Sequence, residues 1–166
     1  MSAKGSKSGS AESRLRDLEI QLPAAPTPPG SYVEVVLSAN LLFLSGMLPV
    51  ADHKPKYIGR LGKELDTETG RDAAYAAGLS ALAAAKDYLG SLDRVTRVVR
   101  LGVFIATSGD FFDLPKIADA ASDLFGAVFG TDRPSVRLVF GVATLPLGTP
   151  DELEVIFEVA QEGGQK

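Results

Sequence analysis

The sequence predicts an α+β fold in which two helices pack on one face of a single, mostly antiparallel sheet. Two long segments, 66–89 and 113–129, have the apolar spacing of amphipathic helices. Segments rich in β-branched residues lie before, between and after these helices, which gives the order β-β-α-β-α-β-β. The chain has 166 residues, 45% of them hydrophobic, so it is long enough for one domain with a buried core.

Residues 1–29 are expected to form a flexible tail before the domain. A short amphipathic helix is predicted at 11–20, where leucines recur near helical spacing. The segment 23–30 reads PAAPTPPG, and its four prolines exclude a helix or an inner strand, so it is a stiff connector. The domain is placed at 30–161, and the last residues, 162–166, lack an apolar period and are expected to fray.

The first half of the domain begins with a predicted hairpin. Apolar runs at 32–37 and 41–47 are separated by a short polar connection, which is typical of two paired strands. The polar stretch 49–65 is expected to be a loop. Asp66 then offers an N-cap for the alanine-rich helix, and Gly90 suits the position after its last turn.

The second half holds the longest predicted strand, at 95–106, because β-branched residues fill it. In the second helix Pro115 falls in the first turn, where proline is tolerated, and Gly130 follows the end. Two further strands are predicted at 135–145 and 152–160, joined by a segment with two prolines.

Side-chain alternation predicts the faces of the last two strands. The bulky Leu138 and Phe140 are expected to meet the helices, which places Arg137 on the face that points away from them. Glu152 and Glu154 fall on the same outer face of the last strand.

The strand at 95–106 is apolar on both faces, although two helices can cover only one face of the sheet. Another copy of the chain is the simplest cover for the second face. The sequence therefore predicts an obligate homo-oligomer.

Composition excludes several classes of function. The chain has no cysteine and one histidine, His53, so thiolate nucleophiles, disulfides and multi-histidine metal sites are excluded. A net charge of −4 argues against nucleic-acid partners. No apolar run is long enough to span a bilayer, and the first ten residues do not form a secretory signal, so a soluble, cytoplasmic protein is expected.

Arg137 is the leading candidate for chemistry, because a guanidinium can bind a carboxylate in bidentate fashion. An ion pair between Arg137 and a glutamate on a neighbouring strand is the alternative. His53 lies in a polar stretch and is expected to be solvated surface.

Four segments resemble, in order, the RidA (YjgF) family: GSYVEVV at 30–36, NLLFLSGMLP at 40–49, DRVTRVVRLGVFIA at 93–106 and PSVRLVFGVATLPLGTPDELEVIFEVA at 134–160. The chain is most similar to the branch with an N-terminal extension and the C-terminal pattern VRxxxGVAxLPLGxPxExE. The resemblance implies a chorismate-mutase-like fold and a homotrimer with clefts for small molecules between its subunits.

Archetypal members of this family hydrolyse enamine and imine intermediates such as 2-aminoacrylate to 2-keto acids and ammonia, without a cofactor or a metal. Carried over by residue, the resemblance implies that Arg137 binds the substrate carboxylate and Glu154 orients the attacking water. It also implies that Tyr32 and Ser45 contribute to substrate binding.

The chain departs from the family pattern at two positions. Leu138 replaces the small polar residue after the arginine, and Asp119 is the polar residue nearest to the place of a family asparagine. These departures favour a second hypothesis, in which the same cleft binds or senses a small carboxylate without turnover. A third hypothesis, an endoribonuclease, is disfavoured by the acidic balance and the single histidine.

Overall fold

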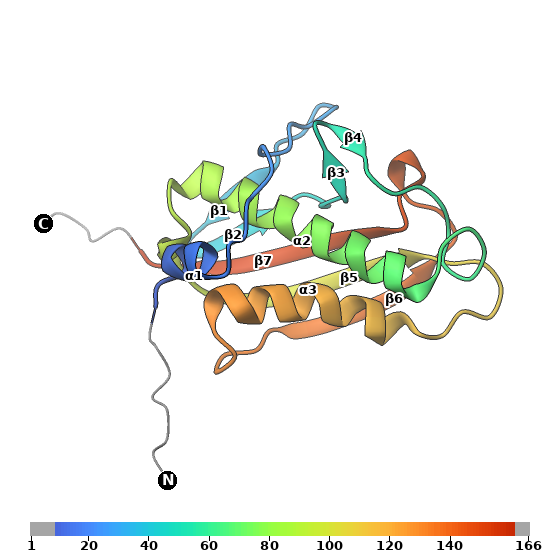
Figure 1. The fold of residues 1–166 in the computed structure, drawn as a ribbon. Helices are drawn as coiled ribbons and strands as arrows, with labels where there is room; N and C mark the ends of the chain where they lie inside the picture. Colours follow the sequence, from blue (N-terminus) through green and yellow to red (C-terminus); the bar gives the residue numbers. More distant parts are fainter. Residues whose placement is uncertain (1–8, 162–166) are drawn as a thin grey trace, which may run out of the picture.

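Two helices lie across one face of a five-stranded sheet in the computed structural model, which describes residues 9–161 (Figure 1). The strands follow the order β1-β2-β7-β5-β6, and only β5 and β6 pair in parallel. Their bounds are β1 Val35–Ser38, β2 Leu41–Leu44, β5 Val95–Ala106, β6 Val136–Val142 and β7 Asp151–Val159. The predicted fold class is confirmed, including the mostly antiparallel sheet and its single helical layer.

The two covering helices are α2, Thr67–Leu89, and α3, Leu114–Phe129. The Asp66 side chain caps α2 by accepting a hydrogen bond from the backbone N–H of Thr69 at 2.8 Å. Gly90 ends α2 in the left-handed conformation, with φ of +79°. The alanines of α2 allow a close approach to α3 and the sheet, and seven of them are buried: Ala73, Ala74, Ala77, Ala81, Ala83, Ala84 and Ala85.

A shorter helix, α1, spans Ala11–Asp17 and packs beside α3 (Figure 1). Leu15 is buried in the main core, whereas Leu18 is half exposed beyond the helix end. The helix stops before the predicted boundary, because Glu19 takes a left-handed φ of +55°. The expected tail ends, at 1–8 and 162–166, lie outside the described residues.

The stretch predicted as a loop contains a small hairpin of β3, Val50–Ala51, and β4, Lys54–Pro55. Asp52 and His53 form its turn, and both have positive φ values, as tight hairpin turns require. Two short 3₁₀ helices precede the long strands β5 and β7, at Leu92–Arg94 and Pro146–Gly148.

The predicted orientation of β6 is wrong. The Arg137 side chain points toward α3, where its Nη1 lies 2.7 Å from Oδ1 of Asp119. Leu138 and Phe140 lie on the opposite face, with 39% and 48% of their surface exposed, and the Phe140 ring stacks on Phe104. Bulky apolar side chains indicate burial or an interface, but they do not say which face of an edge strand the helices cover.

The last strand has the predicted orientation. Every second side chain is buried under the helices, and Glu152, Glu154 and Glu158 lie on the open face. That open face carries exposed apolar side chains on three strands, Val36, Phe43, Val136, Leu138 and Phe140, and partly exposed ones on β5 and β7, Phe104 and Ile156. Within residues 9–161, no helix is both long enough and apolar enough to cross a bilayer.

Candidate functional site

A cavity of about 590 Å³ lies where the N-terminal segment meets the ends of β2 and β7. We call it the acidic pocket, because Glu34 and Glu152 line it together with Tyr32, Ser45 and Gly46. The described residues that line it include no lysine or arginine. The structure therefore brings together two of the predicted site residues, Tyr32 and Ser45, with a carboxylate that the sequence reading did not select.

Glu152 is the carboxylate of the sheet that enters this pocket. It lies at the start of β7, opposite Phe104 of β5, on the open face. Its carboxylate rests against the backbone of Gly46, where any Cβ would overlap the carboxylate oxygen Oε1. Burial raises the pKa of Glu152, so the protonated form persists to higher pH than in a free glutamate. Glycine at position 46 is thus required for this placement.

Tyr32 and Glu34 give the pocket further acidic character. The pKa of Tyr32 is raised by burial and by the negative charges of Glu34 and Glu152. Burial also raises the pKa of Glu34. Three acidic groups therefore share one pocket, and each additional negative charge there is costly.

Ser45 has a structural role within the pocket wall. Its hydroxyl donates a hydrogen bond to the carbonyl of Val33 at 2.7 Å, and its backbone N–H donates to the carbonyl of Glu34 at 2.8 Å. These bonds continue the pairing of the first two strands beyond β1. The Ser45 hydroxyl proton is engaged, so the side chain can offer a ligand only an acceptor.

Arg137 lies elsewhere, on the opposite edge strand of the sheet. Its Nη1 donates to Oδ1 of Asp119 at 2.7 Å and to Oγ of Ser122 at 3.1 Å, both on α3. We call Arg137, Asp119 and Ser122 the arginine edge. The guanidinium is only partly exposed, and it already holds a carboxylate of its own chain.

Glu154 lies in neither place. It projects from the open face of β7 and pairs with Arg100 of β5, whose Nε is 3.4 Å from its Oε2. The Arg–Glu ion pair considered from the sequence thus exists, but it uses Arg100 instead of Arg137. Within one chain, Arg137 and Glu154 lie on opposite faces of the sheet.

Tyr32 of the acidic pocket and the arginine edge are separated by the width of the sheet, and Glu152, on the central strand β7, lies two strands from β6 on the opposite face. Tyr32 comes just before β1 at one edge, and Arg137 lies on β6 at the other. Four strand spacings of about 4.8 Å place these edges roughly 19 Å apart. One chain therefore does not bring Arg137 to the pocket.

His53 is exposed, as expected, at the tip of the β3–β4 hairpin, where it borders the pocket. Its Nδ1 lies 3.4 Å from the hydroxyl Oγ1 of Thr27, at the limit of a hydrogen bond. Among the described residues, no three His, Cys, Asp or Glu side chains are grouped so as to hold a metal ion.

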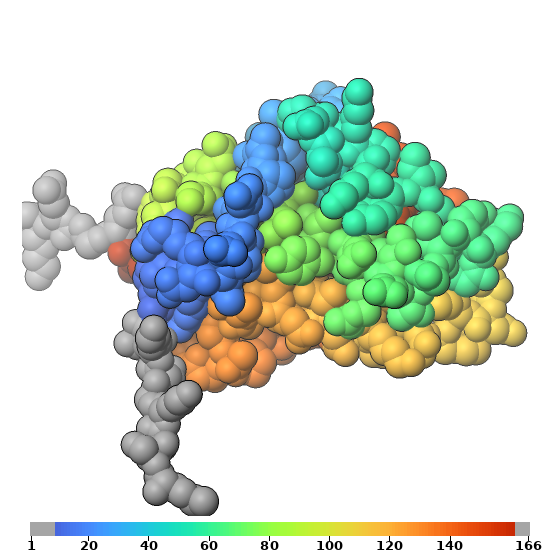
Figure 2. Space-filling view, viewed as in Figure 1, coloured from blue at the N-terminus to red at the C-terminus, as the bar shows by residue number. Residues whose placement is uncertain are grey.

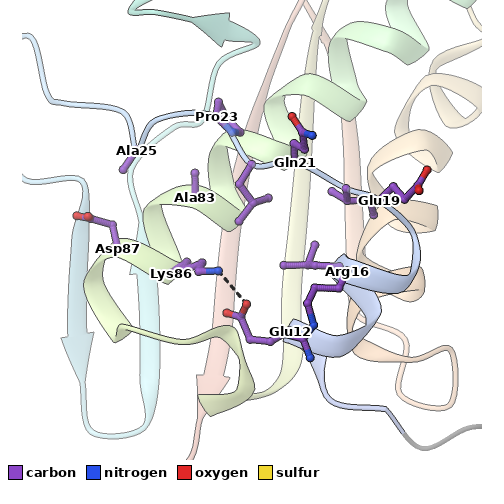
Figure 3. A pocket seen from close by; sticks show the side chains of 12 residues that line it. Glu12, Arg16, Glu19, Gln21, Pro23, Ala25, Ala83, Lys86 and Asp87 are labelled. Atoms are coloured by element: carbon purple, nitrogen blue, oxygen red, sulfur yellow. Dashed lines mark hydrogen bonds and ion pairs between the residues drawn. The ribbon is translucent and has the colours of Figure 1, made fainter.

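A larger hollow, of about 970 Å³, lies between α1, the following segment and α2 (Figure 3). Charged side chains of both signs surround it. Its best-defined contact is an ion pair of 2.8 Å between Glu12 and Lys86, which fastens α1 to α2. These two groups satisfy each other, so neither is free to bind a ligand in the hollow.

Sequence reasoning missed Glu152 in favour of Glu154. The two glutamates are two residues apart on one strand, so alternation places both on the same face. Only the register of β7 against Met47 and Phe104 shows which one reaches the end of the sheet beside Gly46. Glu34 lies two residues after Tyr32, and nothing else in the sequence indicates that it belongs to the site.

Comparison with known proteins gives a consistent result. Residues 12–159 match the family model described as "YjgF/chorismate_mutase-like, putative endoribonuclease". The chain is 39% identical over 153 residues to Protein TCP17 of Trypanosoma cruzi, an alignment that covers 92% of this chain and 96% of that protein.

Two crystal structures are similar throughout. Atu1372 of Agrobacterium tumefaciens, described as having unknown function, is 32% identical with a TM-score of 0.83, and the match covers 90% of this chain and 92% of that one. A "putative endoribonuclease" of Shewanella oneidensis is 28% identical with a TM-score of 0.86, over 91% and 100% of the two chains.

Proposed function

We propose, because the chain belongs to the YjgF/chorismate-mutase-like family, that it hydrolyses reactive enamines and imines to 2-keto acids and ammonia. The reaction would need no cofactor and would take place in clefts between the subunits of a homotrimer. We also propose that the protein acts in the cytoplasm, which a chain without cysteine permits.

The acidic pocket is the observation that carries this proposal. It combines a ligand-sized cavity with the half-buried carboxyl of Glu152, whose pKa is raised by burial. A carboxyl group with a raised pKa exchanges protons near neutral pH more readily than an ordinary one. We therefore assign to Glu152 the role that the resemblance alone would give to Glu154.

Hydrolysis of an imine changes no oxidation state, so the proposed reaction needs no redox partner. Water adds its oxygen to the imine carbon while Glu152 accepts a proton from that water. The same carboxyl then passes this proton to the nitrogen, which gives a carbinolamine. The carbinolamine hydroxyl gives up its proton to the Glu152 carboxylate, which delivers it to the nitrogen, so that the C=O bond forms as the carbon–nitrogen bond breaks and ammonia leaves the 2-keto acid. An enamine first gains a proton at its β-carbon and becomes the imine.

The substrate carboxylate needs a permanent cation, and the described residues that line the acidic pocket include no lysine or arginine. We assign this role to Arg137 of a neighbouring subunit. A heterologous contact between the β6 edge of one chain and the β1 edge of the next repeats in a ring and closes as a trimer. The exposed apolar side chains on the open face supply surface for such a contact.

Activity is tested with an enamine made in place by a pyridoxal-phosphate dehydratase acting on serine. The purified protein should speed the release of pyruvate above the rate in solvent alone. Glu152→Gln should abolish most of that gain, whereas Glu154→Gln should keep activity within a few-fold of wild type. The opposite ranking would return the catalytic role to Glu154.

The oligomer is tested by sedimentation equilibrium over a range of protein concentrations. A single species of three times the chain mass is expected. A stable monomer would contradict the shared site, because Arg137 would then have no access to the acidic pocket.

One observation favours the second candidate, binding without turnover. The Arg137 guanidinium is already neutralised by Asp119, which weakens its hold on a substrate that must stay in place during proton transfer. A keto acid that raises the melting temperature of a protein with no hydrolase activity would support this candidate.

Ribonuclease activity, which the descriptions of the family model and of the Shewanella oneidensis structure name, fits the pocket poorly. Glu34 and Glu152 would repel a phosphodiester. Cleavage of a single-stranded RNA by wild type, but not by Glu152→Gln, would contradict this conclusion.

A further inference from the structure

Part of the acidic pocket is built by a segment outside the predicted domain. Residues 23–30, here called the proline strap, lead from α1 to β1, and the strap contributes Pro26, Pro28 and Pro29 to the pocket wall. Figure 2 shows the blue N-terminal segment crossing the green helix α2 toward the cyan β3–β4 hairpin. Strap and hairpin thus meet over the pocket.

The strap is held in place by contacts before it and within it. Before it, Glu12 pairs with Lys86 at 2.8 Å (Figure 3). Glu12 also accepts a hydrogen bond from the backbone N–H of Leu92 at 3.0 Å, and the two contacts fix α1. Within it, Thr27 contacts His53 of the hairpin. Because each proline also has a fixed φ, the wall loses little conformational entropy when a ligand binds.

A second apolar contribution comes from Leu147, in the 3₁₀ helix before β7. Leu147 has a left-handed φ of +59°, which costs a branched side chain about 1–2 kcal/mol. Its side chain lines the pocket and is 60% exposed. A strained residue that presents an apolar group to a cavity is typical of a binding surface.

The acidic and the apolar residues of the pocket therefore come from different structural elements. The acidic groups are Glu152 of β7 and Glu34 just before β1, whereas the strap, the hairpin and the 3₁₀ helix supply proline, valine and leucine side chains. A cavity of about 590 Å³ is in the range that encloses ligands with a substantial apolar part. A substrate as small as 2-aminoacrylate, which has only a methylene group, would leave this apolar surface in contact with water.

We propose that the strap and Leu147 bind the side chain of the substrate, and that the preferred substrates are imines of amino acids with branched aliphatic or aromatic side chains. This inference rests on the proposed function and adds the substrate class to it. Burial of one such side chain is expected to favour these imines over the alanine imine by about 10- to 100-fold in kcat/KM.

The test uses the full chain and imines made in place by a flavin amino-acid oxidase, from alanine, leucine or phenylalanine, with semicarbazide trapping of the imine that remains. The leucine and phenylalanine imines should be hydrolysed with at least tenfold higher kcat/KM. Leu147→Ala should lower that preference by about tenfold. Leu18→Ala, which removes an exposed leucine outside the pocket, is the matched control.

Binding of the keto-acid products separates this inference from the proposed function. Calorimetric titration should show 4-methyl-2-oxopentanoate binding at least tenfold more tightly than pyruvate, and Leu147→Ala should remove the difference. If no imine is hydrolysed, the proposed function is wrong. The ratio of the affinities for the two keto acids still tests whether the strap and Leu147 bind an apolar side chain. Equal affinity for both keto acids, or an equal loss for all imines in Leu147→Ala, would overturn it.

Discussion

The acidic pocket and the arginine edge carry opposite chemistry on opposite faces of one sheet. The pocket holds carboxyl groups without a lysine or arginine among its described lining residues, and burial raises the pKa values of these carboxyls. At the arginine edge, Arg137 is neutralised by Asp119. Each region contains what the other needs to bind an anionic substrate, so the comparison suggests that a working site needs two chains.

The most direct test of a site shared by two chains is to inactivate the two regions in separate variants. Arg137→Ala and Glu152→Gln should each lower kcat/KM by about 10²- to 10³-fold, because one removes the anion clamp and the other the proton carrier. After unfolding and refolding of an equal mixture, about a quarter of the sites would join two intact halves, if the interface is heterologous. Enzyme assays on the mixture should therefore recover about a quarter of the wild-type activity.

A mixture that stays as inactive as its components would show that both residues act within one chain. Each refolded variant alone, assayed in parallel, provides the control for refolding losses.

Gly46→Ala tests the pocket alone. The added Cβ would overlap Oε1 of Glu152 and displace that carboxylate, and a shift of about 1 Å at a catalytic group costs up to 10²-fold in rate. The matched control is Gly102→Ala, whose Cβ would lie 3.1 Å from Oε2 of Glu154. Steady-state assays should show a loss for Gly46→Ala at least tenfold greater than for Gly102→Ala, and equal losses would favour Glu154.

Asp119→Asn tests the arginine edge alone. Removal of the internal carboxylate leaves the Arg137 guanidinium free for a ligand, and a charge-assisted hydrogen bond of this kind is worth about 1.5–3 kcal/mol. KM for a carboxylate substrate should fall about five- to tenfold, with kcat less affected. Asp123→Asn, on the exposed side of α3, serves as the control. An increased KM in Asp119→Asn would show that Asp119 positions the arginine.

The smallest expected effect is the pH dependence of stability. Burial raises the folded-state pKa of Glu34, so its contribution to stability is complete below the unfolded pKa and is lost as pH rises through the folded pKa. Glu34→Gln has no such ionisation. Its melting temperature relative to wild type should increase between about pH 4 and about pH 8. A constant difference across this range would contradict the assignment.

Much of the fold was predictable because local signals agreed with one another. The cap at Asp66, the glycine at position 90 and the β-branched run of β5 each specify an element boundary through backbone chemistry. The β3–β4 hairpin was missed, because Asp52 and His53 reach a tight turn without the glycine that usually marks one.

The candidate site was less predictable because its members depend on register and on faces. The resemblance named Tyr32, Ser45 and Arg137, but alternation did not distinguish Glu152 from Glu154, and the size of Leu138 suggested the wrong face for Arg137. The proline strap was expected to be a connector, since nothing in PAAPTPPG shows that it crosses α2 to reach a pocket.

The sequence by itself determined the α+β class, the main helix ends, the absence of cysteine and multi-histidine chemistry, and the family. These properties follow from local conformational preference, composition and residue order. Only the tertiary structure decided that Glu152 meets Tyr32 beside Gly46, that Arg137 pairs with Asp119, and that the strap forms a pocket wall. Such contacts join residues far apart in the chain, so they depend on how strands align and helices pack, which no local pattern encodes.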